Sequence, residues 1–406
     1  MHLEYDLGLD DAQREIRDTA HRFAADVLRP ASLAIDRLPP GDVVTSGSLL
    51  EKVVRQAHEF GFTRLTGPAD LGGLEAPPVT QHLVLEELAW GSLGIASSIF
   101  LSEWPPQAAL ATGSAELIDR FSRPYYQSGG FRFGAWAITE PNHGSDTLAA
   151  IRPGLRAKGG GDLIARRDGD HWILNGQKSA WVSNGPIASQ AVVNANVDPE
   201  GLHRGVVLIL PLDSPGVSRG RPLDKHGVRS LPQGEIFFED VRVPRANTIA
   251  EGEGYPVHVE STLTAFNAIV ATLAVGLARA AFDAALRYTK ERLQGGKPIF
   301  EHQSVRARLF RMFTLLRASR ALSRQVFVHQ VSQLGAGGPA PIEHSIASKV
   351  FCTDAALEIA TLAVQLHGGN GMTKEYPVEM FLRDATSFTI ADGENAFLSQ
   401  VGASML

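Results

Sequence analysis

Apolar residues recur every three or four positions through most of residues 1–130, which is the spacing of amphipathic helices. The first helix is expected to begin at Asp10 or Asp11, either of which can cap it, and to end at Pro30, because proline lacks a backbone N–H. Further helices are expected at 48–60, 79–90, 95–112 and 115–126. The Trp104-Pro105-Pro106 sequence can interrupt the third of these. This part of the chain is therefore predicted to be mostly helical.

From Phe131 the pattern changes to short β-prone runs separated by turns. The runs are FRFGAWAI, HWILNG, KSAWVSN, QAVVNANV, GVVLILP and GEIFFEDVRVP. Short strands at such even spacing favour a small barrel or a sandwich. Asn175-Gly176 is typical of a tight hairpin turn. Residues 152–170, rich in glycine and charge, are expected to form an exposed hairpin or a disordered loop.

Helical periodicity returns after Pro244 and continues almost to the end of the chain. Long apolar stripes at 258–293, 302–334 and 342–366 suit an antiparallel helical bundle. Glycines at 368–371 end the third stripe, and Pro377 stands near the first turn of a shorter helix. The order along the chain is therefore α, then β, then α.

Composition narrows the class of protein. With 406 residues, 44% hydrophobic and 20% charged, the chain is typical of a soluble globular protein of two or three domains. The net charge of −6 argues against nucleic acid as a partner. A single cysteine, Cys352, excludes an internal disulfide and a cysteine-based metal site. We expect no apolar run of membrane-span length and no signal peptide in MHLEYDLGLDD, so a cytoplasmic location is expected.

The stretch from Gln365 to Asp392, QLHGGNGMTKEYPVEMFLRDATSFTIAD, carries the most specific motif. Its Q-x-x-G-G-x-G, E-Y-P-V-E and R-D-A elements, followed by an acid before glycine, resemble the C-terminal signature of the acyl-CoA dehydrogenase family. By that resemblance, Gln365, Gly368 and Gly369 contact the FAD of a neighbouring subunit. Asp392 stands where most of the family has the glutamate that removes the substrate α-proton.

Three further motifs resemble flavin-binding segments of the same family. The first is WAITEPNHGSD at 136–146, a strand followed by a turn that exposes backbone N–H groups. The second is LNGQKSAWVSN at 174–184, and the third is KERLQGGKPIFEHQSV at 290–305, where Gly295 replaces the usual phenylalanine.

The resemblance assigns roles to these motifs residue by residue. The flavin ring would be lined by Trp136, Ile138, Thr139, Trp181 and Ser183. Gly144 and Ser145 would reach the FAD phosphates or the thioester carrier, so that Ser145 also binds substrate. Arg292 would pair with the FAD phosphates, and Gln303 would contact FAD.

The motif leaves two roles open for Asp392, the catalytic base and a helix cap. A carboxylate one methylene shorter than glutamate sits back by about 1.5 Å. Asp392-Gly393 also fits an alternative role as the cap of the last helix, with Glu394 in its first turn. Some members take their base from the helix near residue 267, but Asn267 stands here in place of a common arginine and is expected to contact the substrate. Glu103 could reach the site from the N-terminal part of the chain.

The resemblance implies an α+β fold with a helical N-terminal domain (1–130), a small β-barrel domain (131–248) and a C-terminal antiparallel four-helix bundle (249–406). It implies an FAD-dependent dehydrogenase that desaturates an acyl thioester of CoA or a carrier protein. The expected partners are an electron-transfer flavoprotein or another acceptor and a second copy, in a homodimer or homotetramer, with no nucleic acid and no membrane. Two alternatives are a flavin oxidase or monooxygenase with a non-thioester substrate, and an inactive flavin-binding homologue.

Overall fold

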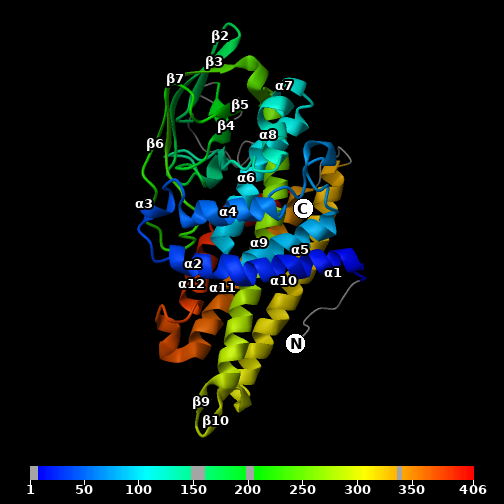
Figure 1. Ribbon diagram of the computed structural model, residues 1–406, viewed down its shortest axis with the longest axis vertical. Coiled ribbons are helices and arrows are strands. Elements are labelled where there is room, and N and C mark those ends of the chain that lie inside the picture. The colour runs from blue at the N-terminus through cyan, green and yellow to red at the C-terminus, as the bar shows by residue number, and fades with distance from the viewer. Residues whose placement is uncertain (1–7, 148–160, 198–204, 336–340) are drawn as a thin grey trace.

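Helices come before and after the main β-sheet along the chain, so the predicted α+β fold is confirmed (Figure 1). The computed structural model describes residues 8–147, 161–197, 205–335 and 341–406. Part of the glycine-rich excursion, residues 152–160, lies outside the described residues. The β region occupies one end of the long axis, and the longest helices extend to the other end (Figure 1).

The N-terminal helices begin where the sequence predicts, but proline does not end the first one. Asp10 caps it by accepting the Gln13 N–H at 2.8 Å. A π-helical turn, Ala24–Leu28, then leads directly into a second helix, with Pro30 in the first turn, where no N–H is needed. The helices are α1 (Asp11–Phe23), α2 (Arg29–Ile35), α3 (Pro40–Val43), α4 (Leu49–Glu59), α5 (Pro78–Gly91), α6 (Leu93–Ala111), α7 (Ala115–Leu117) and α8 (Arg123–Tyr126).

Helix α6 also continues through Pro105 and Pro106, so the predicted interruption there is wrong. Both prolines are buried, and the backbone at Gly134 approaches Pro105 so closely that an added Cβ would lie 2.7 Å from the proline ring. Tertiary packing of α6 against the sheet therefore holds a helix that local propensity disfavours.

The middle region forms one eight-stranded sheet in the order β6-β7-β3-β2-β4-β5-β8, with β1 paired to β4. Its strands are β1 (Gly134–Ala137), β2 (Ile164–Asp168), β3 (His171–Lys178), β4 (Gln190–Asn196), β5 (Gly205–Pro211), β6 (Val217–Arg219), β7 (Ile236–Pro244) and β8 (Thr248–Glu251). β1 and β2 run parallel to β4, and the other neighbouring pairs are antiparallel.

The predicted hairpin at Asn175-Gly176 is wrong. The dipeptide lies inside β3, where the pairing with β7 shifts register between Leu174 and Gly176. The two residues form a β-bulge, in which Gly176 adopts φ +130°. The hairpin turn is instead Gly169-Asp170, between β2 and β3. The run KSAWVSN is also not a strand beyond Lys178, because residues 180–181 and 184–187 are turns.

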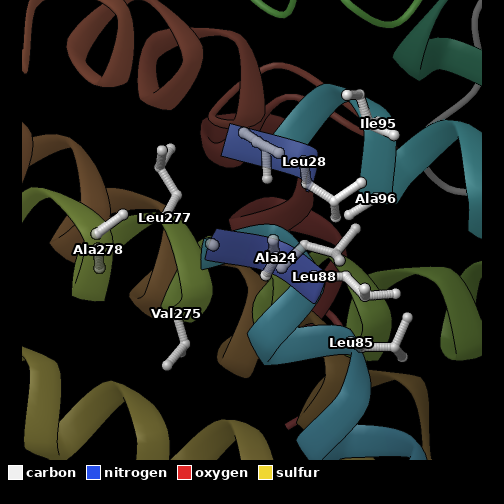
Figure 2. Packing of buried hydrophobic residues seen from close by; sticks show 14 of the residues in the cluster. Ala24, Leu28, Leu85, Leu88, Ile95, Ala96, Val275, Leu277 and Ala278 are labelled. Carbon is white, nitrogen blue, oxygen red and sulfur yellow. The ribbon is translucent and has the colours of Figure 1, made fainter. Parts of the chain in front are cut away.

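The C-terminal region is a bundle around α9, which packs against α5, α10, α11 and α12. Figure 2 shows part of the shared core, in which Leu85 and Leu88 of α5 and Val275 and Leu277 of α9 belong to one buried cluster. Gly276 allows this close approach, because an added Cβ would lie 2.4 Å from the Glu86 carbonyl oxygen. The elements are α9 (Gly254–Glu291), β9 (Leu293–Gln294), β10 (Lys297–Pro298), α10 (Gln303–Gly335), α11 (Ile342–His367), α12 (Val378–Phe388) and α13 (Asn395–Ala403).

The expectation that no apolar segment reaches membrane-span length is wrong for helix α9. It is long and apolar enough to span a membrane by length and composition alone, and 83% of its most apolar window is buried inside the fold. Such burial is typical of a central core helix of a soluble bundle. Scattered polar residues interrupt the apolar positions of α9, so the sequence contains no continuous apolar run of that length.

Candidate active site

The first motif that resembles a flavin-binding segment, residues 136–146, begins in strand β1, at the interface between the sheet and the helices. The Trp136 indole Nε1–H donates to the Asn194 side-chain oxygen at 3.0 Å, which fixes the indole against β4. Beyond the strand, the hydroxyls of Thr139 and Ser179 lie 2.8 Å apart, and the Ser179 N–H donates to the Thr139 carbonyl at 3.0 Å. The backbone and side chain of Thr139 are therefore held from the end of β3.

A buried ion pair anchors the same segment. Lys178 Nζ lies 2.6 Å from a carboxylate oxygen of Glu140, and both side chains are almost fully buried. Lys178 also donates to the carbonyl of Ile138 at 3.0 Å. Burial lowers the pKa of Lys178, and the Glu140 carboxylate opposes that change. Sequence reasoning missed this pair, although a lysine at the end of an apolar strand was the available signal.

The turn after this segment is open on one side and in contact with the C-terminal region on the other. The Gly144 N–H donates to the Asp146 carboxylate at 2.7 Å, and a Cβ at Gly144 would meet no atom within 4 Å. The Ser145 hydroxyl accepts the N–H of Glu394 at 3.1 Å. That bond places the loop containing Asp392 directly against the first motif.

The Asp392 loop is a sharp turn between α12 and α13. Asp392 and Gly393 both have positive φ, +51° and +104°. The alternative role of Asp392 as a helix cap is wrong, because the cap of α13 is Glu394, whose carboxylate accepts the N–H groups of Ala396 and Phe397, both at 2.9 Å. Within the described part of the chain, no group donates a hydrogen bond to the Asp392 carboxylate.

Lys349 of α11 holds this loop from the inside. Its buried ammonium donates to the Gly393 carbonyl at 2.7 Å, to the Asn395 side-chain oxygen at 2.7 Å and to the Thr389 carbonyl at 3.5 Å. Burial lowers the pKa of Lys349 to about 8, against the opposing effect of nearby carboxylates, chiefly Asp392. No sequence motif indicated this residue.

The surroundings of the Asp392 carboxyl make it a weaker acid than a solvated aspartate. Desolvation raises its pKa to about 6, and the Lys349 ammonium lowers it in part. A general base is most effective when its pKa lies near the working pH. An ionised carboxylate without hydrogen-bond donors is therefore chemically suited to accept a proton.

Residues of the second motif lie on the turn after β3. The Gln233 amide donates to the Ser183 hydroxyl at 3.0 Å and to the Trp181 carbonyl at 3.1 Å. The Trp181 side chain remains 61% exposed. An exposed indole with a fixed backbone is suited to contact a planar ligand.

The remaining predicted cofactor residues gather at the far end of α9. They are all exposed and comprise Arg292, Gln303, Gln365, Gly368 and Gly369. Tyr288 ties the glycine loop to α9, because its ring stacks on His367 at 4.1 Å and its hydroxyl accepts from the Asn370 amide at 3.0 Å. Gly295 and Gly296, with φ +64° and +79°, form the turn between β9 and β10, so the glycine that replaces the usual phenylalanine has a backbone role.

The structure does not bring these residues to the first motif within one chain. Phe266 of α9 lies beside Trp136, with ring centroids 4.7 Å apart. Arg292 follows Phe266 by 26 residues, or roughly 40 Å of helix. Figure 1 shows the β9–β10 hairpin at the end of the molecule opposite the sheet. We name Trp136, Thr139, Ser145 and Asp392 the catalytic patch, and the five exposed residues at the end of α9 the distal patch.

Two other predicted residues have defined surroundings. Asn267 is fully buried and donates to the Leu263 carbonyl at 2.8 Å, and no group in the described part of the chain bonds its side-chain oxygen. Glu103 accepts hydrogen bonds from Thr66, at 2.7 Å from the hydroxyl, and burial raises its pKa to about 7. Glu103 is therefore bound within the N-terminal helices.

The described residues fit a flavin dinucleotide. Open space at Gly144, the exposed Trp181 indole and the exposed Arg292 side chain provide a phosphate turn, a stacking surface and a cation. Gly368 and Gly369 also face open space, because a Cβ at either would meet nothing within 4 Å.

Comparison with known proteins assigns the same family to each part of the chain. Residues 10–127, 135–241 and 252–406 match the N-terminal, middle and C-terminal domains of acyl-CoA dehydrogenase. Benzylmalonyl-CoA dehydrogenase of Aromatoleum aromaticum is 30% identical over 398 residues, covering 98% of both chains.

Two solved structures have closely similar folds. Butyryl-CoA dehydrogenase from Megasphaera elsdenii superposes with a TM-score of 0.85 at 28% identity, covering 98% of this chain and 99% of the other. A chain from a structure described as the electron transferring flavoprotein of Acidaminococcus fermentans also has a TM-score of 0.85, at 30% identity and with the same coverage. Both structures match this chain over nearly its whole length.

Proposed function

The chain belongs to the acyl-CoA dehydrogenase family, and from this membership we propose that it is an FAD-dependent enzyme that desaturates an acyl thioester between Cα and Cβ. The family is flavin-dependent and acts on CH–CH groups. The observation that carries the proposal is the Asp392 carboxylate, which lies in a loop bonded to the first flavin-like motif through Ser145 and has a pKa near neutrality.

In the proposed reaction, Asp392 removes the α-proton of the thioester. Its carboxylate is available because the cap of α13 is made by the neighbouring Glu394. Lys349 fixes the turn and favours the ionised form of Asp392. The turn itself is rigid, since the Gly393 carbonyl is bonded from α11 and the Glu394 N–H is bonded to Ser145.

The described residues would hold FAD in two groups. The ring would contact Trp136, Ile138, Thr139, Trp181 and Ser183, and the adjoining phosphates would contact Gly144 and Ser145. Bound flavin supplies the acceptor for the β-hydride and passes the electrons on. Lys178 and Glu140 maintain the ring-binding segment without touching the cofactor in the arrangement described.

We propose a homodimer or a homotetramer as the working form. The linker between the two ends of FAD spans roughly 20 Å when extended, at about 1.5 Å per bond, whereas roughly 40 Å of helix separate the two patches of one chain. The catalytic patch of one copy and the distal patch of another would together complete each cofactor site. The exposure of Arg292, Gln303 and Gln365 in a single chain supports that arrangement.

The substrate is proposed to be a CoA thioester, and the electron acceptor an electron-transfer flavoprotein in the cytoplasm. A similarly folded chain comes from a structure described as an electron transferring flavoprotein, and a relative is named for a CoA thioester. A carrier-protein thioester is the variant of this proposal that the same chemistry allows, because both carriers end in phosphopantetheine.

The test is anaerobic titration of the FAD-loaded protein with a panel of acyl-CoAs while the visible flavin band is recorded. Bleaching by one acyl chain supports the reaction and identifies the substrate class. The same titration with pantetheine thioesters of a carrier protein separates the two carriers. A protein that takes up no FAD, or whose flavin no acyl thioester bleaches, contradicts the proposal.

A further inference from the structure

Among the residues that the structure describes, three buried polar atoms that have no hydrogen-bond partner belong to neighbouring side chains of α6 and α9. They are Trp104 Nε1, His258 Nε2 and Thr262 Oγ1. The rings of Trp104 and His258 have centroids 6.3 Å apart. Thr262 lies one helical turn after His258 on the same face of α9. The three side chains therefore form one polar group between two helices.

This group is connected to the catalytic patch through one aromatic ring. Phe266, one further turn along α9, packs edge-on against Trp104 at 5.0 Å and against Trp136 at 4.7 Å. Phe266 is also the neighbour of Asn267, the residue expected to contact substrate. The polar group thus lies one ring away from the indole that is proposed to line the flavin, and one helical turn from the residue expected to contact substrate.

A buried polar group without a hydrogen-bond partner destabilises the fold, and buried hydroxyls in helices usually avoid this by bonding to a backbone carbonyl of the same helix. Each buried polar group without a partner costs about 1–3 kcal/mol. Thr264 is as buried as Thr262, but its hydroxyl donates to the Glu260 carbonyl at 2.8 Å. The Thr262 hydroxyl makes no such bond in the described structure. A ligand that supplies partners would remove the cost at Thr262 and at both ring nitrogens.

The chemistry of the group favours an uncharged oxygen as the partner. Indole N–H groups only donate, whereas imidazole and hydroxyl groups donate or accept. Burial lowers the pKa of His258 to about 4, with no charged side chain contributing to the change. The imidazole is therefore neutral, and among the described residues no charged side chain affects its pKa, so a carboxylate would find no counter-charge there.

We propose that the acyl group of the substrate carries an uncharged oxygen function, a hydroxyl, oxo or ether group, that is bound by Trp104, His258 and Thr262. The proposal rests on the proposed dehydrogenase function and specifies its substrate class. The oxygen lies beyond the β-carbon, because the reacting carbons face Asp392 and the flavin ring. An alkyl acyl group of the same length would leave all three polar groups unpaired.

The experiment compares pairs of acyl-CoAs that have the same number of heavy atoms. Each pair consists of an ω-hydroxyacyl-CoA and the alkyl acyl-CoA in which a methyl replaces the hydroxyl, over a series of increasing length. Rates of anaerobic flavin reduction and dissociation constants of the matching 2-enoyl-CoAs are measured. We expect a preference of about 10- to 100-fold for the oxygenated member at one length, the value of one to two satisfied buried hydrogen bonds.

Variants of the three polar residues test whether they cause the preference for oxygenated acyl groups. Thr262→Val and Trp104→Phe should each reduce it several-fold, mainly by weakening binding of the oxygenated enoyl-CoA. Thr264→Val removes a hydroxyl of the same helix and should leave the ratio between the paired ligands unchanged. Because the ratio is taken within each variant, a general loss of stability does not imitate the effect.

Two failures have different meanings. If alkyl acyl-CoAs bleach the flavin as well as their oxygenated partners at every length, or if Thr262→Val leaves the preference intact, the inference is wrong and the dehydrogenase function stands. If no acyl thioester of either kind, on CoA or on a carrier protein, bleaches the flavin or binds, the proposed function fails and the inference fails with it.

Discussion

The loop that carries Asp392 and the end of α9 that carries Arg292 occupy opposite environments. The loop is bonded on both sides, by Lys349 at Gly393 and by Ser145 at Glu394. Arg292 is exposed, and the part of the chain that the structure describes offers its guanidinium no hydrogen-bond partner. The supports of the catalytic patch are therefore all present within a single chain. The distal patch lacks such supports and would be completed by a ligand or a second copy.

The difference has a physical origin in what each patch must do. A base must be held within a fraction of an ångström of its target, which requires buried and fully bonded supports. A cation that binds phosphates gains its energy from charge-assisted hydrogen bonds formed on contact, so it can remain solvated until then. The catalytic patch is therefore predicted to be sensitive to changes in its supports, and the distal patch to changes in its own side chains.

The largest effect is expected from Asp392→Asn. Removing the general base should slow anaerobic flavin reduction by about 10²- to 10⁴-fold, while FAD content stays unchanged because the distal patch is intact. Stopped-flow spectroscopy gives the rate, and the flavin absorbance gives the loading. The Glu394→Gln variant is a control, since it alters the adjacent helix cap and keeps the base. Activity that survives in Asp392→Asn would show that another group removes the proton.

A smaller and different effect is expected from Arg292→Ala. The loss of charge-assisted bonds to phosphate should weaken FAD binding by about 10- to 100-fold, without slowing reduction once the protein is fully loaded. Arg311→Ala is the matched control, because Arg311 is an exposed arginine that already pairs with Glu358 at 2.8 Å. Equal FAD affinity in the two variants would exclude Arg292 from the cofactor site.

Mixing the two variants tests the composite site directly. In a hybrid of Asp392→Asn and Arg292→Ala chains, one site receives both intact residues and the other receives both changes. After unfolding and refolding together at limiting FAD, the mixture should be clearly more active than either parent. If each chain binds FAD with its own distal patch, the mixture will only average the two parents.

Lys349→Met should lower the rate of flavin reduction several-fold near pH 6. The Lys349 ammonium lowers the pKa of Asp392, so its removal should raise that pKa above about 6 and shift the rate profile to higher pH. Lys225→Met is the matched control, because Lys225 is also bonded to three oxygens, at 2.6 to 3.0 Å, and interacts with Asp384 instead. A purely structural lysine would lower stability in both variants and move neither profile.

The smallest effect concerns stability. The pKa of Asp392 rises from 3.8 to about 6 on folding, so native protein binds more protons between these values and loses stability as pH increases through them. Asp392→Asn lacks this loss and should be more stable than the parent by about 1 kcal/mol above pH 6, with partial exposure and the lost Lys349 interaction reducing the gain. Urea denaturation should give equal stabilities near pH 4. If the parent protein is more stable than Asp392→Asn at pH 8, burial does not raise the pKa of Asp392 as described.

Sequence reasoning succeeded where the signal is local. The α, β, α order follows from periodicity, and the cap at Asp10 and the end of α11 before Gly368 follow from short-range backbone requirements. It failed at Asn175-Gly176 and at Pro30, where a bulge and a π-helical turn accommodate residues that normally end a strand or a helix. In both places, tertiary packing outweighs a local preference of about 1–3 kcal/mol.

The amino-acid sequence by itself determined the family motifs, the aspartate at position 392 and the glycine loop at 368–371, because these depend on residue identity and spacing. Only the tertiary structure decided that Lys349 supports the loop, that Glu394 caps α13 in place of Asp392, and that the two sets of predicted cofactor residues lie far apart along α9. The reason is distance along the chain. Lys349 and Gly393 are 44 residues apart, and Ser145 and Glu394 are 249 apart, so their contacts exist only after the helices and the sheet have packed.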